Sequence, residues 1–402
     1  MLNIDSSRPL LKSLGRIRSL KHFMIRGHII LFFPLVDWDT PWQRYQHLAL
    51  RFSNANRVIY VNSPAAITYL RRSPAHLAKK WLRFIRGKEK INSNLSIYHP
   101  PPCLPCERIS KWVNRLNQYI LFLYLKIFVK SEDNIILWIN DPYKYLMTKL
   151  LKPRIAVYDC PDAIVFQNGR LRQKVYDELK RKVLKESTIS FFTSKALLAQ
   201  GRKYSETCFY VPNGVDARSF RRASYRVPDD MRKLQGIILG AVGTFDERID
   251  LELIEFVLET IKYATLLLVG PVQMKLGNLA RHPRVVLSGK REYEEIPSFI
   301  NKFDVALIPY RINKVTMAVY PVKLHEYLIL GKPVVSTDLP EVRQFSNVIW
   351  VGHSKEEFAR QVQEALADND ETKREKRVEV AKNNSWERRI TDISNSIERY
   401  LK

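Results

Sequence analysis

The sequence predicts an α/β protein with two doubly wound parallel sheets. Short apolar runs of strand length alternate with helical patterns along most of the chain, and this alternation is typical of parallel strands covered by helices on both faces. The 402 residues are enough for two domains of ordinary size, and 46% of them are hydrophobic, as in globular proteins. These observations exclude a disordered or fibrous chain.

The first expected domain covers residues 28–216 and follows a basic extension at residues 1–27. It opens with an apolar strand at residues 28–33. Later apolar runs are short enough for strands, and the segments between them have helical periodicity. The further expected strands are residues 57–61, 95–98, 134–139, 154–158, 188–193 and 207–211, and the expected helices are residues 107–130, 169–186 and 194–202.

The second expected domain covers residues 236–384, after a charged linker at residues 217–235 without periodicity. A last amphipathic helix is expected within residues 385–402. The alternation of strands and helices again predicts a parallel sheet. The expected strands are residues 236–242, 265–271, 284–288, 304–309 and 333–337, and the expected helices are residues 250–263, 292–303 and 321–330.

The helix expected at residues 321–330 has clear boundaries. Pro321 suits the first helical position because it lacks an N–H group, and Gly331 suits a left-handed stop. The helix starts at the carboxyl end of a parallel strand, where free N–H groups and the helix dipole favour an anion. Lys323 and Glu326 lie three apart on one face, so together they could hold the diphosphate and ribose of a nucleotide. The alternative is an exposed ion pair on a surface helix.

The run PVKLHEYLILGKPVV at residues 321–335 resembles the donor-binding segment of GT-B glycosyltransferases of the retaining, family-4-like type (group 1). Bacterial cell-surface polysaccharide and teichuronic acid biosynthesis glycosyltransferases are similar. The run PNGVD at residues 212–216 resembles the hinge entry of that family. The resemblance implies two Rossmann-like domains facing across a cleft, with the C-terminal helix crossing back to the first domain. It also implies that Lys323 faces the donor diphosphate and that Glu326 binds the donor ribose.

The donor site implied by this resemblance shows two departures from the family. Members commonly have Gly-Arg and a later Lys after the first strand of this domain, whereas this chain has Gly243 and Thr244, so Arg248 is left as the second cation. The first glutamate of the family's pair is replaced by Ala318. Two explanations are open. Backbone N–H groups of residues 318–323 hold the donor sugar, or the donor sugar differs from that of the family and carries its own carboxylate, as a uronic acid would. We expect Arg248 and Lys323 to be catalytic and the donor to contact Gly243, Thr244, Lys290 near the base, Tyr320, Pro321, Val322 and Glu326.

The first domain carries a second resemblance, at residues 42–49. WQRYQHLA is similar to a W-Q-R-P-Q-H-L-A signature found in a subset of GT-B enzymes, with Tyr45 in place of the proline. It implies that Gln43, Arg44 and His47 lie at the interdomain cleft, where an acceptor or the transferred sugar could contact them. Helix capping and hydrogen bonding in the core are the alternative. Asn140 and Asp141 stand where family members often have a sugar-binding histidine, and we include both in the expected acceptor or sugar site.

No metal or other cofactor is expected. Asp37 and Asp39 match the D-x-D pair of metal-dependent GT-A enzymes, but only one strand precedes them, whereas in that class the pair follows a complete βαβ unit. Cys103 and Cys106 form a lone C-x-x-C without the second ligand pair of a zinc site, so we expect reduced thiols.

The charge of the chain is concentrated in its first half. Residues 1–212 contain 36 Lys and Arg against 14 Asp and Glu, whereas residues 213–402 contain 30 against 27. Residues 71–90 mix cations with apolar side chains, as does the basic extension, and this mixture suits an anionic membrane surface; a solvated helix face is the alternative. No run is long enough to span a membrane, and residues 116–129 are expected to form a buried or interfacial helix. We expect no signal peptide and a cytoplasmic protein, peripheral at the inner face of the cell membrane.

The expected activity is transfer of a sugar from a nucleotide-diphosphate sugar, with UDP as the expected nucleotide, to a lipid-linked or cell-surface glycan with retention. Two alternatives stay open, a sugar-nucleotide epimerase of the same fold and a non-catalytic scaffold that binds membrane or glycan. A nucleic-acid partner is not expected, because the sequence contains no recognised nucleic-acid-binding module.

Overall fold

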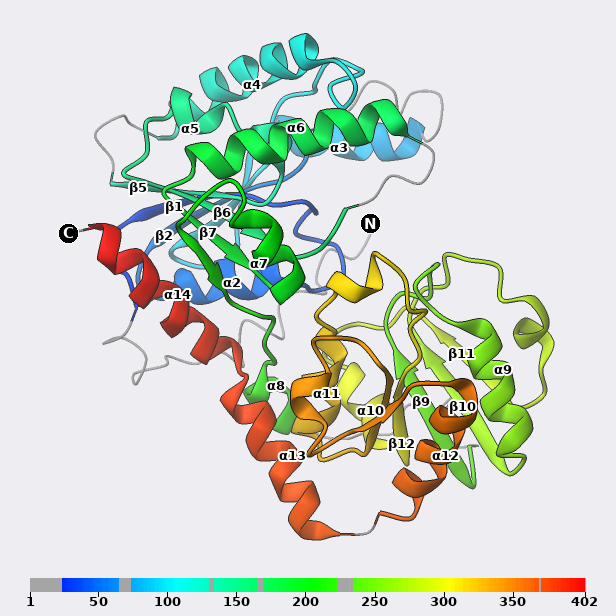
Figure 1. Ribbon diagram of the computed structural model, residues 1–402. Helices are drawn as coiled ribbons and strands as arrows, with labels where there is room; N and C mark the ends of the chain where they lie inside the picture. Colours follow the sequence, from blue (N-terminus) through cyan, green and yellow to red (C-terminus); the bar gives the residue numbers. More distant parts are fainter. Residues whose placement is uncertain are drawn as a thin grey trace. The chain divides into compact units, whose positions relative to one another are not determined.

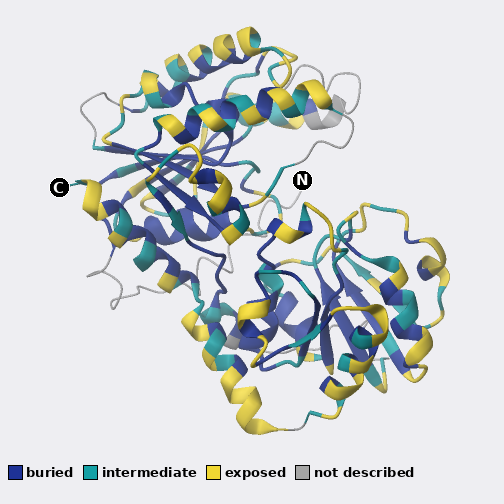
Figure 2. Cartoon of the chain, in the orientation of Figure 1, coloured by how far each residue is buried: buried dark blue, intermediate teal, exposed yellow. Residues whose placement is uncertain are grey.

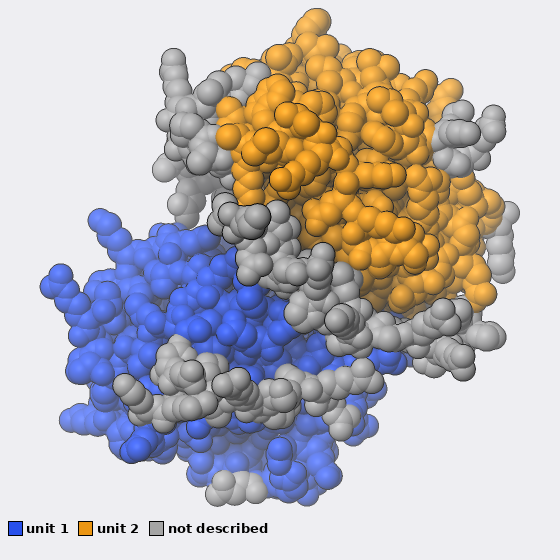
Figure 3. Space-filling view, turned by 180° about the vertical axis from the view of Figure 1, so that it is seen from behind, with its two compact units in different colours: residues 1–15, 213–388 blue, residues 16–212, 389–402 orange. Residues whose placement is uncertain are grey.

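The computed structural model describes residues 24–64, 74–129, 134–164, 169–222, 231, 234–368 and 370–401. The basic extension expected at residues 1–27 therefore lies almost entirely outside the described residues. The chain forms two compact units (Figure 3). Among the described residues, 213–388 form the C-terminal unit, and residues 24–212 together with residues 389–401 form the N-terminal unit.

The N-terminal unit is built on an eight-stranded sheet in the order β3-β4-β2-β1-β5-β6-β7-β8 (Figure 1). All pairs are parallel except β3 with β4. If the parallel strands are numbered along the chain, the order is 3-2-1-4-5-6-7, so the sheet is doubly wound from its centre. The strands are β1 (Ile29–Phe33), β2 (Arg57–Val61), β3 (Lys88–Lys90), β4 (Leu95–Tyr98), β5 (Ile135–Ile139), β6 (Ile155–Cys160), β7 (Ile189–Phe192) and β8 (Cys208–Tyr210).

Helices cover both faces of this sheet (Figure 1). Stacked aromatic rings line its interior, with Trp138 of β5 between Phe32 of β1 at 5.2 Å and Phe191 of β7 at 5.9 Å. One face carries α3 (Pro74–Arg86), α4 (Lys111–Lys126), α5 (Met147–Leu150) and α6 (Arg170–Glu186), with the turn η3 (Pro142–Lys144), and the other carries α2 (Arg44–Phe52), α7 (Lys195–Gly201) and α14 (Trp386–Leu401).

The residues of the last helix, α14, are divided between the two units. Trp386 belongs to the C-terminal unit, whereas residues 389–401 belong to the N-terminal unit. Ile390, Ile393 and Ile397 are fully buried at helical spacing. The predicted return of the C-terminal helix to the first unit is therefore seen in the structure.

The C-terminal unit has a six-stranded, all-parallel sheet in the order β11-β10-β9-β12-β13-β14. Numbered along the chain, this order is 3-2-1-4-5-6, that of the Rossmann fold. The strands are β9 (Ile237–Val242), β10 (Ala264–Val269), β11 (Val285–Gly289), β12 (Val305–Ile308), β13 (Val334–Thr337) and β14 (Trp350–Gly352). The helices are α8 (Ala217–Arg222), α9 (Leu251–Thr260), α10 (Ile296–Asn301), α11 (Val322–Ile329), α12 (Lys355–Leu366) and α13 (Glu371–Asn383), with the short turns η5 (Gly277–Arg281), η6 (Thr316–Ala318) and η7 (Arg343–Phe345).

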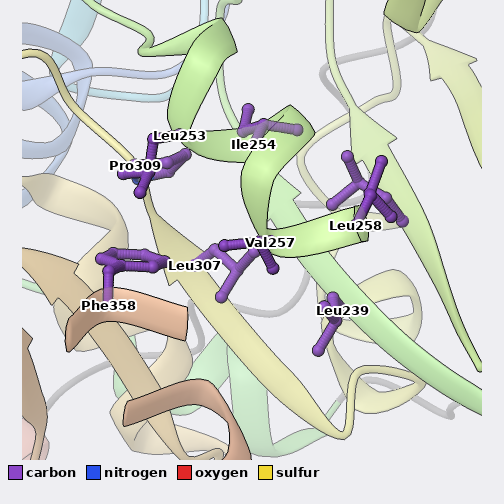
Figure 4. A pocket seen from close by; sticks show the side chains of 9 residues that line it. Leu239, Leu253, Ile254, Val257, Leu258, Leu307, Pro309 and Phe358 are labelled. Carbon is purple, nitrogen blue, oxygen red and sulfur yellow. The ribbon is translucent and has the colours of Figure 1, made fainter. Parts of the chain in front are cut away.

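An apolar pocket lies between α9 and the sheet of this unit (Figure 4). Leu253 and Val257 of α9, Leu307 of β12 and Phe358 of α12 are among the side chains that line it. They leave no room for a water molecule and belong to the hydrophobic core. The pocket is therefore core packing and not a ligand site.

The structure describes parts of two expected chain segments. The expected linker at residues 217–235 begins with α8, because Phe220 is fully buried and packs edge-on against Tyr293 at 5.6 Å. Residues 71–73 of the basic segment at residues 71–90 lie outside the described residues, and the remainder forms α3 and β3.

His99, which follows β4, makes the stability of the N-terminal unit depend on pH. Burial, followed by the charge of Arg83, lowers the pKa of His99 from 6.5 to about 4. The unfolded chain takes up a proton near pH 6.5 but the folded chain does not, so stability is complete above that pH and is lost as the pH falls toward 4. At pH 5 we expect a loss of about 2 kcal/mol. Urea unfolding at pH 7 and pH 5 measures it, and His99→Gln should reduce the difference; an unchanged difference would contradict this assignment.

Candidate functional site

The candidate donor site lies at the switch point of the C-terminal sheet, where β9 and β12 are neighbours and their chain connections diverge. In open parallel sheets, ligands bind outside the carboxyl ends of the strands at such a point. The loop after β9 and the loop after β12 are joined by backbone hydrogen bonds from Asp250 N–H to Pro309 O at 2.9 Å and from Arg311 N–H to Arg248 O at 2.8 Å. The two loops are therefore held together as one surface.

Glycines keep the start of this surface free of side chains. The φ of Gly270, after β10, is +140°, and a Cβ atom placed on it would lie 1.9 Å from the carbonyl oxygen of Gly243. Gly243 itself has a φ of +151°. Both values lie in the region that favours glycine, so the backbone between β9 and β10 can approach closely. Gly243 and Thr244, both expected to contact the donor, lie on this loop.

Helix α11 begins at the same edge, directly after the loop of β12. Pro321 is the N-cap residue with a ψ of 109°, so the helix starts at Val322 and not at Pro321 as expected. Gly331, with a φ of +73°, ends the helix region as predicted. The hydroxyl of Tyr327 accepts a hydrogen bond from the N–H of Val242 at 2.8 Å, which fixes α11 against the end of β9. The first turn of α11 thus lies beside the switch point, where helix N–H groups can meet an anion.

Lys323 and Glu326 are paired on the first turns of α11. Nζ of Lys323 donates to Oε2 of Glu326 at 2.8 Å. The lysine side chain is 23% exposed, whereas the glutamate side chain is only 2% exposed. Their three-residue spacing predicted that they lie close together, and we expected each to make its own contact with the donor. In this structure they form an ion pair with each other. The pair is therefore partly buried and not the exposed surface pair of the alternative reading.

Arg248, the second expected cation, is held within its own loop. Its Nε and Nη2 atoms donate to the two carboxylate oxygens of Asp246, both at 2.8 Å. Its guanidinium carbon lies 5.9 Å from the centre of the Tyr310 ring. These contacts hold the guanidinium group between Asp246, in the loop after β9, and Tyr310, in the loop after β12. About a third of the side chain stays exposed.

The loop before α11 uses much of its own backbone. The N–H groups of Ala318 and Val319 donate to Val315 O at 3.1 Å and Thr316 O at 3.0 Å. These two amides of the expected sugar-holding segment are therefore already engaged. Tyr320 is buried, and its hydroxyl lies 2.5 Å from Nε2 of His325, a contact that sequence reasoning missed. The side chain of Tyr320 is therefore part of the core, and its carbonyl oxygen accepts from Nδ2 of Asn213 at 3.4 Å.

Lys290 is exposed at the end of β11. It lies on the same edge of the sheet, but β10 separates its strand from β9. The neighbouring Arg291 is fixed by Ser288, with Nε 2.8 Å from its Oγ atom, and stacks on Phe299 at 4.9 Å. Lys290 is therefore at the outer end of the candidate donor surface, where we expected the base of the donor nucleotide to bind.

The N-terminal unit has its own switch point, between β1 and β5. Gln43 is exposed as the N-cap residue of α2, and its N–H donates to Oε1 of Gln46 at 3.1 Å. The side chains of Arg44 and His47 are 2% exposed. Nδ1 of His47 lies 3.3 Å from Nη1 of Arg51. Capping and core hydrogen bonding, the alternative left open for these residues, describes their side chains.

Asp159 at the end of β6 organises this edge, and sequence reasoning missed it. Its carboxylate is fully buried and accepts from Nε of Arg44 at 3.0 Å and from Nδ2 of Asn140 at 3.1 Å. Nη1 of Arg44 continues to Pro212 O at 3.2 Å. Within the described residues, Nη2 of Arg44 and Oδ1 of Asn140 have no hydrogen-bond partner. An aspartate inside the apolar run Ile155–Cys160 was the signal that could have revealed it, because a buried charge requires a partner.

Asp141, the last expected sugar-site residue, has a structural role. Its Oδ1 atom accepts from Tyr143 N–H at 3.1 Å and caps the turn η3. Burial, only partly offset by Lys144 and Arg108, raises the pKa of this carboxyl above its usual range. Asn140 and Asp141 therefore both lie at the carboxyl end of β5, but only Asn140 joins the Asp159 cluster.

Asp37 and Asp39, the D-x-D pair, are occupied by cations of α3. Asp37 pairs with Lys80 at 3.2 Å, and Asp39 pairs with Arg83 at 2.7 Å. Burial alone would raise the pKa of Asp39, but the hydrogen bond and charge of Arg83 lower it below its usual value. Among the described residues, no group of three or more His, Cys, Asp or Glu side chains is arranged to hold a metal ion. All four cysteines are free.

Several solved structures superimpose on nearly the whole chain. Sucrose-phosphate synthase from Thermosynechococcus elongatus superimposes with a TM-score of 0.68 at 15% identity, covering 93% of this chain and 99% of that chain. The α,α-trehalose 6-phosphate synthase from Burkholderia multivorans gives a TM-score of 0.66 at 10% identity, covering 94% and 98%. A trehalose-6-phosphate structure from E. coli, bound with UDP-2-fluoro glucose, gives 0.67 at 10% identity, covering 94% and 99%. The fold is GT-B, as predicted.

Sequence comparisons then give the activity class. Residues 236–368 match the family described as glycosyl transferases group 1. A Bacillus subtilis (strain 168) protein named as a teichuronic acid biosynthesis glycosyltransferase, TuaH, is 28% identical over 276 residues, which cover 62% of this chain and 68% of that protein. Within the C-terminal unit, residues 236–368 thus resemble glycosyl transferases group 1, and the protein is a glycosyltransferase with the GT-B fold.

Proposed function

We propose that the protein transfers a sugar from a nucleotide-diphosphate sugar to a lipid-linked or cell-surface glycan, with retention of the anomeric configuration. The observation that carries this proposal is the grouping of Arg248, Lys323 and the first turn of α11 at the switch point of a Rossmann-type sheet. Cations and free N–H groups at such a place suit a diphosphate. Glu326, on the same turn, is the group expected for the ribose hydroxyls.

The proposed chemistry needs no side-chain base. The bond from the anomeric carbon to the diphosphate oxygen breaks, and the acceptor hydroxyl oxygen forms its bond on the same face. The proton of that hydroxyl passes to the departing diphosphate. Lys323, Arg248 and the α11 amides act by stabilising the negative charge that develops on the leaving group. For Lys323, this means exchanging its contact with Glu326 for one with the phosphate.

Two comparisons support the identity of the substrates. The E. coli structure with this fold was solved with a UDP-sugar analogue, so we propose UDP as the donor nucleotide. The relative from Bacillus subtilis is named for teichuronic acid biosynthesis, so we propose a cell-envelope glycan as the acceptor. The excess of cations in residues 1–212 supports an acceptor held at an anionic membrane surface.

Activity is expected to survive removal of divalent ions. Asp37 and Asp39, which resemble a metal-binding pair, form ion pairs with Lys80 and Arg83. In the proposed site, Lys323 and Arg248 stabilise the charge of the leaving diphosphate, so no metal ion is needed for that role. Initial rates measured with and without a chelator should agree. A complete loss that Mg²⁺ or Mn²⁺ restores would contradict this prediction and return Asp37 and Asp39 to the candidate site.

The proposal is tested by incubating the full chain with candidate UDP-sugars. Slow release of UDP without acceptor, accelerated by an envelope glycan acceptor, is expected of a transferase. Interconversion of the sugar without transfer would favour the epimerase, and binding without turnover would favour the scaffold. Either result would overturn the proposed transfer reaction.

A further inference from the structure

Helix α4 exposes large apolar side chains, which an ordinary surface helix buries. Trp112, Leu116, Tyr119, Leu123 and Ile127 recur at intervals of three or four residues along and just after this helix, so they share one face. That face points outward (Figure 2). Trp112 is 75% exposed, Leu123 64% and Ile127 74%. More than half of the large exposed apolar side chains in the described residues lie between residues 81 and 127.

The inward face of α4 carries amides that fix its rotation. Nδ2 of Asn114 donates to Tyr143 O at 3.0 Å, and Oε1 of Gln118 accepts from Leu146 N–H at 2.8 Å. Asn117 is bonded through both its oxygen and its nitrogen to the backbone of Leu104. Because these buried amides would lose their partners if the helix turned, the apolar face cannot rotate inward. Its exposure is a fixed feature of the unit.

Helix α3 extends the same face. Leu82 is 57% exposed, Ile85 74% and Trp81 42%. The ring of Phe84 on α3 lies 6.3 Å from that of Tyr124 on α4, so the two helices are neighbours. We call the exposed apolar residues of the two helices, from Trp81 to Ile127, the α3–α4 apolar face. It is larger than the scattered apolar residues that a globular surface normally shows.

Helices α3 and α4 contain several cations but no acidic residue. Residues 108–127 contain four Lys and Arg and no Asp or Glu, and residues 74–88 contain five and none. Lys80 and Arg83 are engaged with Asp37 and Asp39. Arg86, Arg115 and Lys126 remain exposed around the apolar residues. The surface therefore combines apolar side chains with positive charge.

We propose that the α3–α4 apolar face docks on an anionic lipid bilayer. Its apolar side chains enter the boundary between headgroups and acyl chains, and its cations contact the anionic headgroups. A second copy of the chain fits less well, because a symmetric pair would bring the cations of one copy against those of the other. No helix of the described residues is long and apolar enough to cross a membrane. This inference rests on the proposed function in one respect, which is that docking brings the enzyme to a lipid-held acceptor.

The test uses flotation of the full chain with vesicles of phosphatidylcholine alone or mixed with phosphatidylglycerol, without donor or acceptor. The chain should float with the mixed vesicles. The double variant Leu116→Ser and Leu123→Ser should bind them about tenfold or more weakly, because two apolar side chains no longer leave water. The matched control replaces Tyr263 and Leu287 of the C-terminal unit, which are 63% and 43% exposed, with Ser. It should bind as the unchanged chain does.

A second readout reports on Trp112 directly. Brominated lipids should quench the tryptophan fluorescence of the bound chain, and replacing both Trp112 and Trp81 with Phe should remove most of that quenching. Equal vesicle binding by the α4 variant and the control would overturn the proposal. So would sedimentation showing that the unchanged chain self-associates and the α4 variant does not, since the face would then join two copies. Turnover of UDP-sugar is measured separately, so its absence with docking intact would overturn the proposed function alone.

Discussion

Replacing Lys323 with Ala is expected to lower turnover by about a hundredfold or more, because the departing diphosphate loses a cation that acts mainly in the transition state. The lysine is well placed for this role, since it lies in the first turn of α11 at the switch point and is 23% exposed. Release of UDP at saturating donor measures the effect. Lys275→Ala, at an exposed position of the same unit, is the matched control and should turn over normally.

Glu326→Ala is expected chiefly to weaken nucleotide affinity. Since Glu326 is 2% exposed and accepts from Lys323 at 2.8 Å, the two substitutions are expected to be coupled. The loss in the double variant should then be smaller than the sum of the two single losses in free energy. Near-normal rates and affinities in both single variants would remove these residues from the donor site.

Asp159→Ala is expected to destabilise the N-terminal unit by about 3–5 kcal/mol, because it leaves the buried guanidinium group of Arg44 without its counter-charge. Both residues are almost completely buried, and their ion pair is 3.0 Å long. Trp138 also loses a partner, since its Nε1 atom donates to the same carboxylate at 3.3 Å. Urea unfolding followed by tryptophan fluorescence should show an earlier transition for this unit.

The double replacement of Asp159 by Leu and Arg44 by Met provides the control. It removes both charges and keeps most of the volume, so part of the lost stability should return, although Trp138 and Asn140 still lack the carboxylate as acceptor. If Asp159→Ala unfolds at the same urea concentration as the unchanged chain, the cluster is not the structural centre of this edge.

Strands were predictable where an apolar run is bounded by polar residues. The strands Arg57–Val61 and Leu95–Tyr98 have the expected bounds, and others differ by one or two residues at their ends. The edge strand β3, Lys88–Lys90, is exposed and charged, so it carries no apolar pattern. Helix α13 was missed for a related reason, because only Arg377 and Ala381 are buried along it and no amphipathic stripe results.

The candidate site was predictable only as far as local spacing reaches. Lys323 and Glu326 are three residues apart, so helical geometry brings them together. The partner of Arg44 is Asp159, 115 residues away, and no local pattern indicates that pairing. The same limit applies to α4, which was expected to be either buried or interfacial. Distant partners, such as Tyr143 and Leu146 for the inward amides, decide which face of the helix points outward.

The division of α14 between the units has a consequence for how the protein is made. On the ribosome the chain up to residue 212 emerges first, yet its unit is completed only by residues 389–401, with Ile390, Ile393 and Ile397 as the buried contacts. At about 5–20 residues per second, synthesis of the intervening segment takes roughly ten to forty seconds. During that interval the first-made unit exposes the apolar surface that α14 later covers. The part synthesised first is therefore the last to finish folding, and chaperones that bind apolar surfaces have that interval in which to act on it.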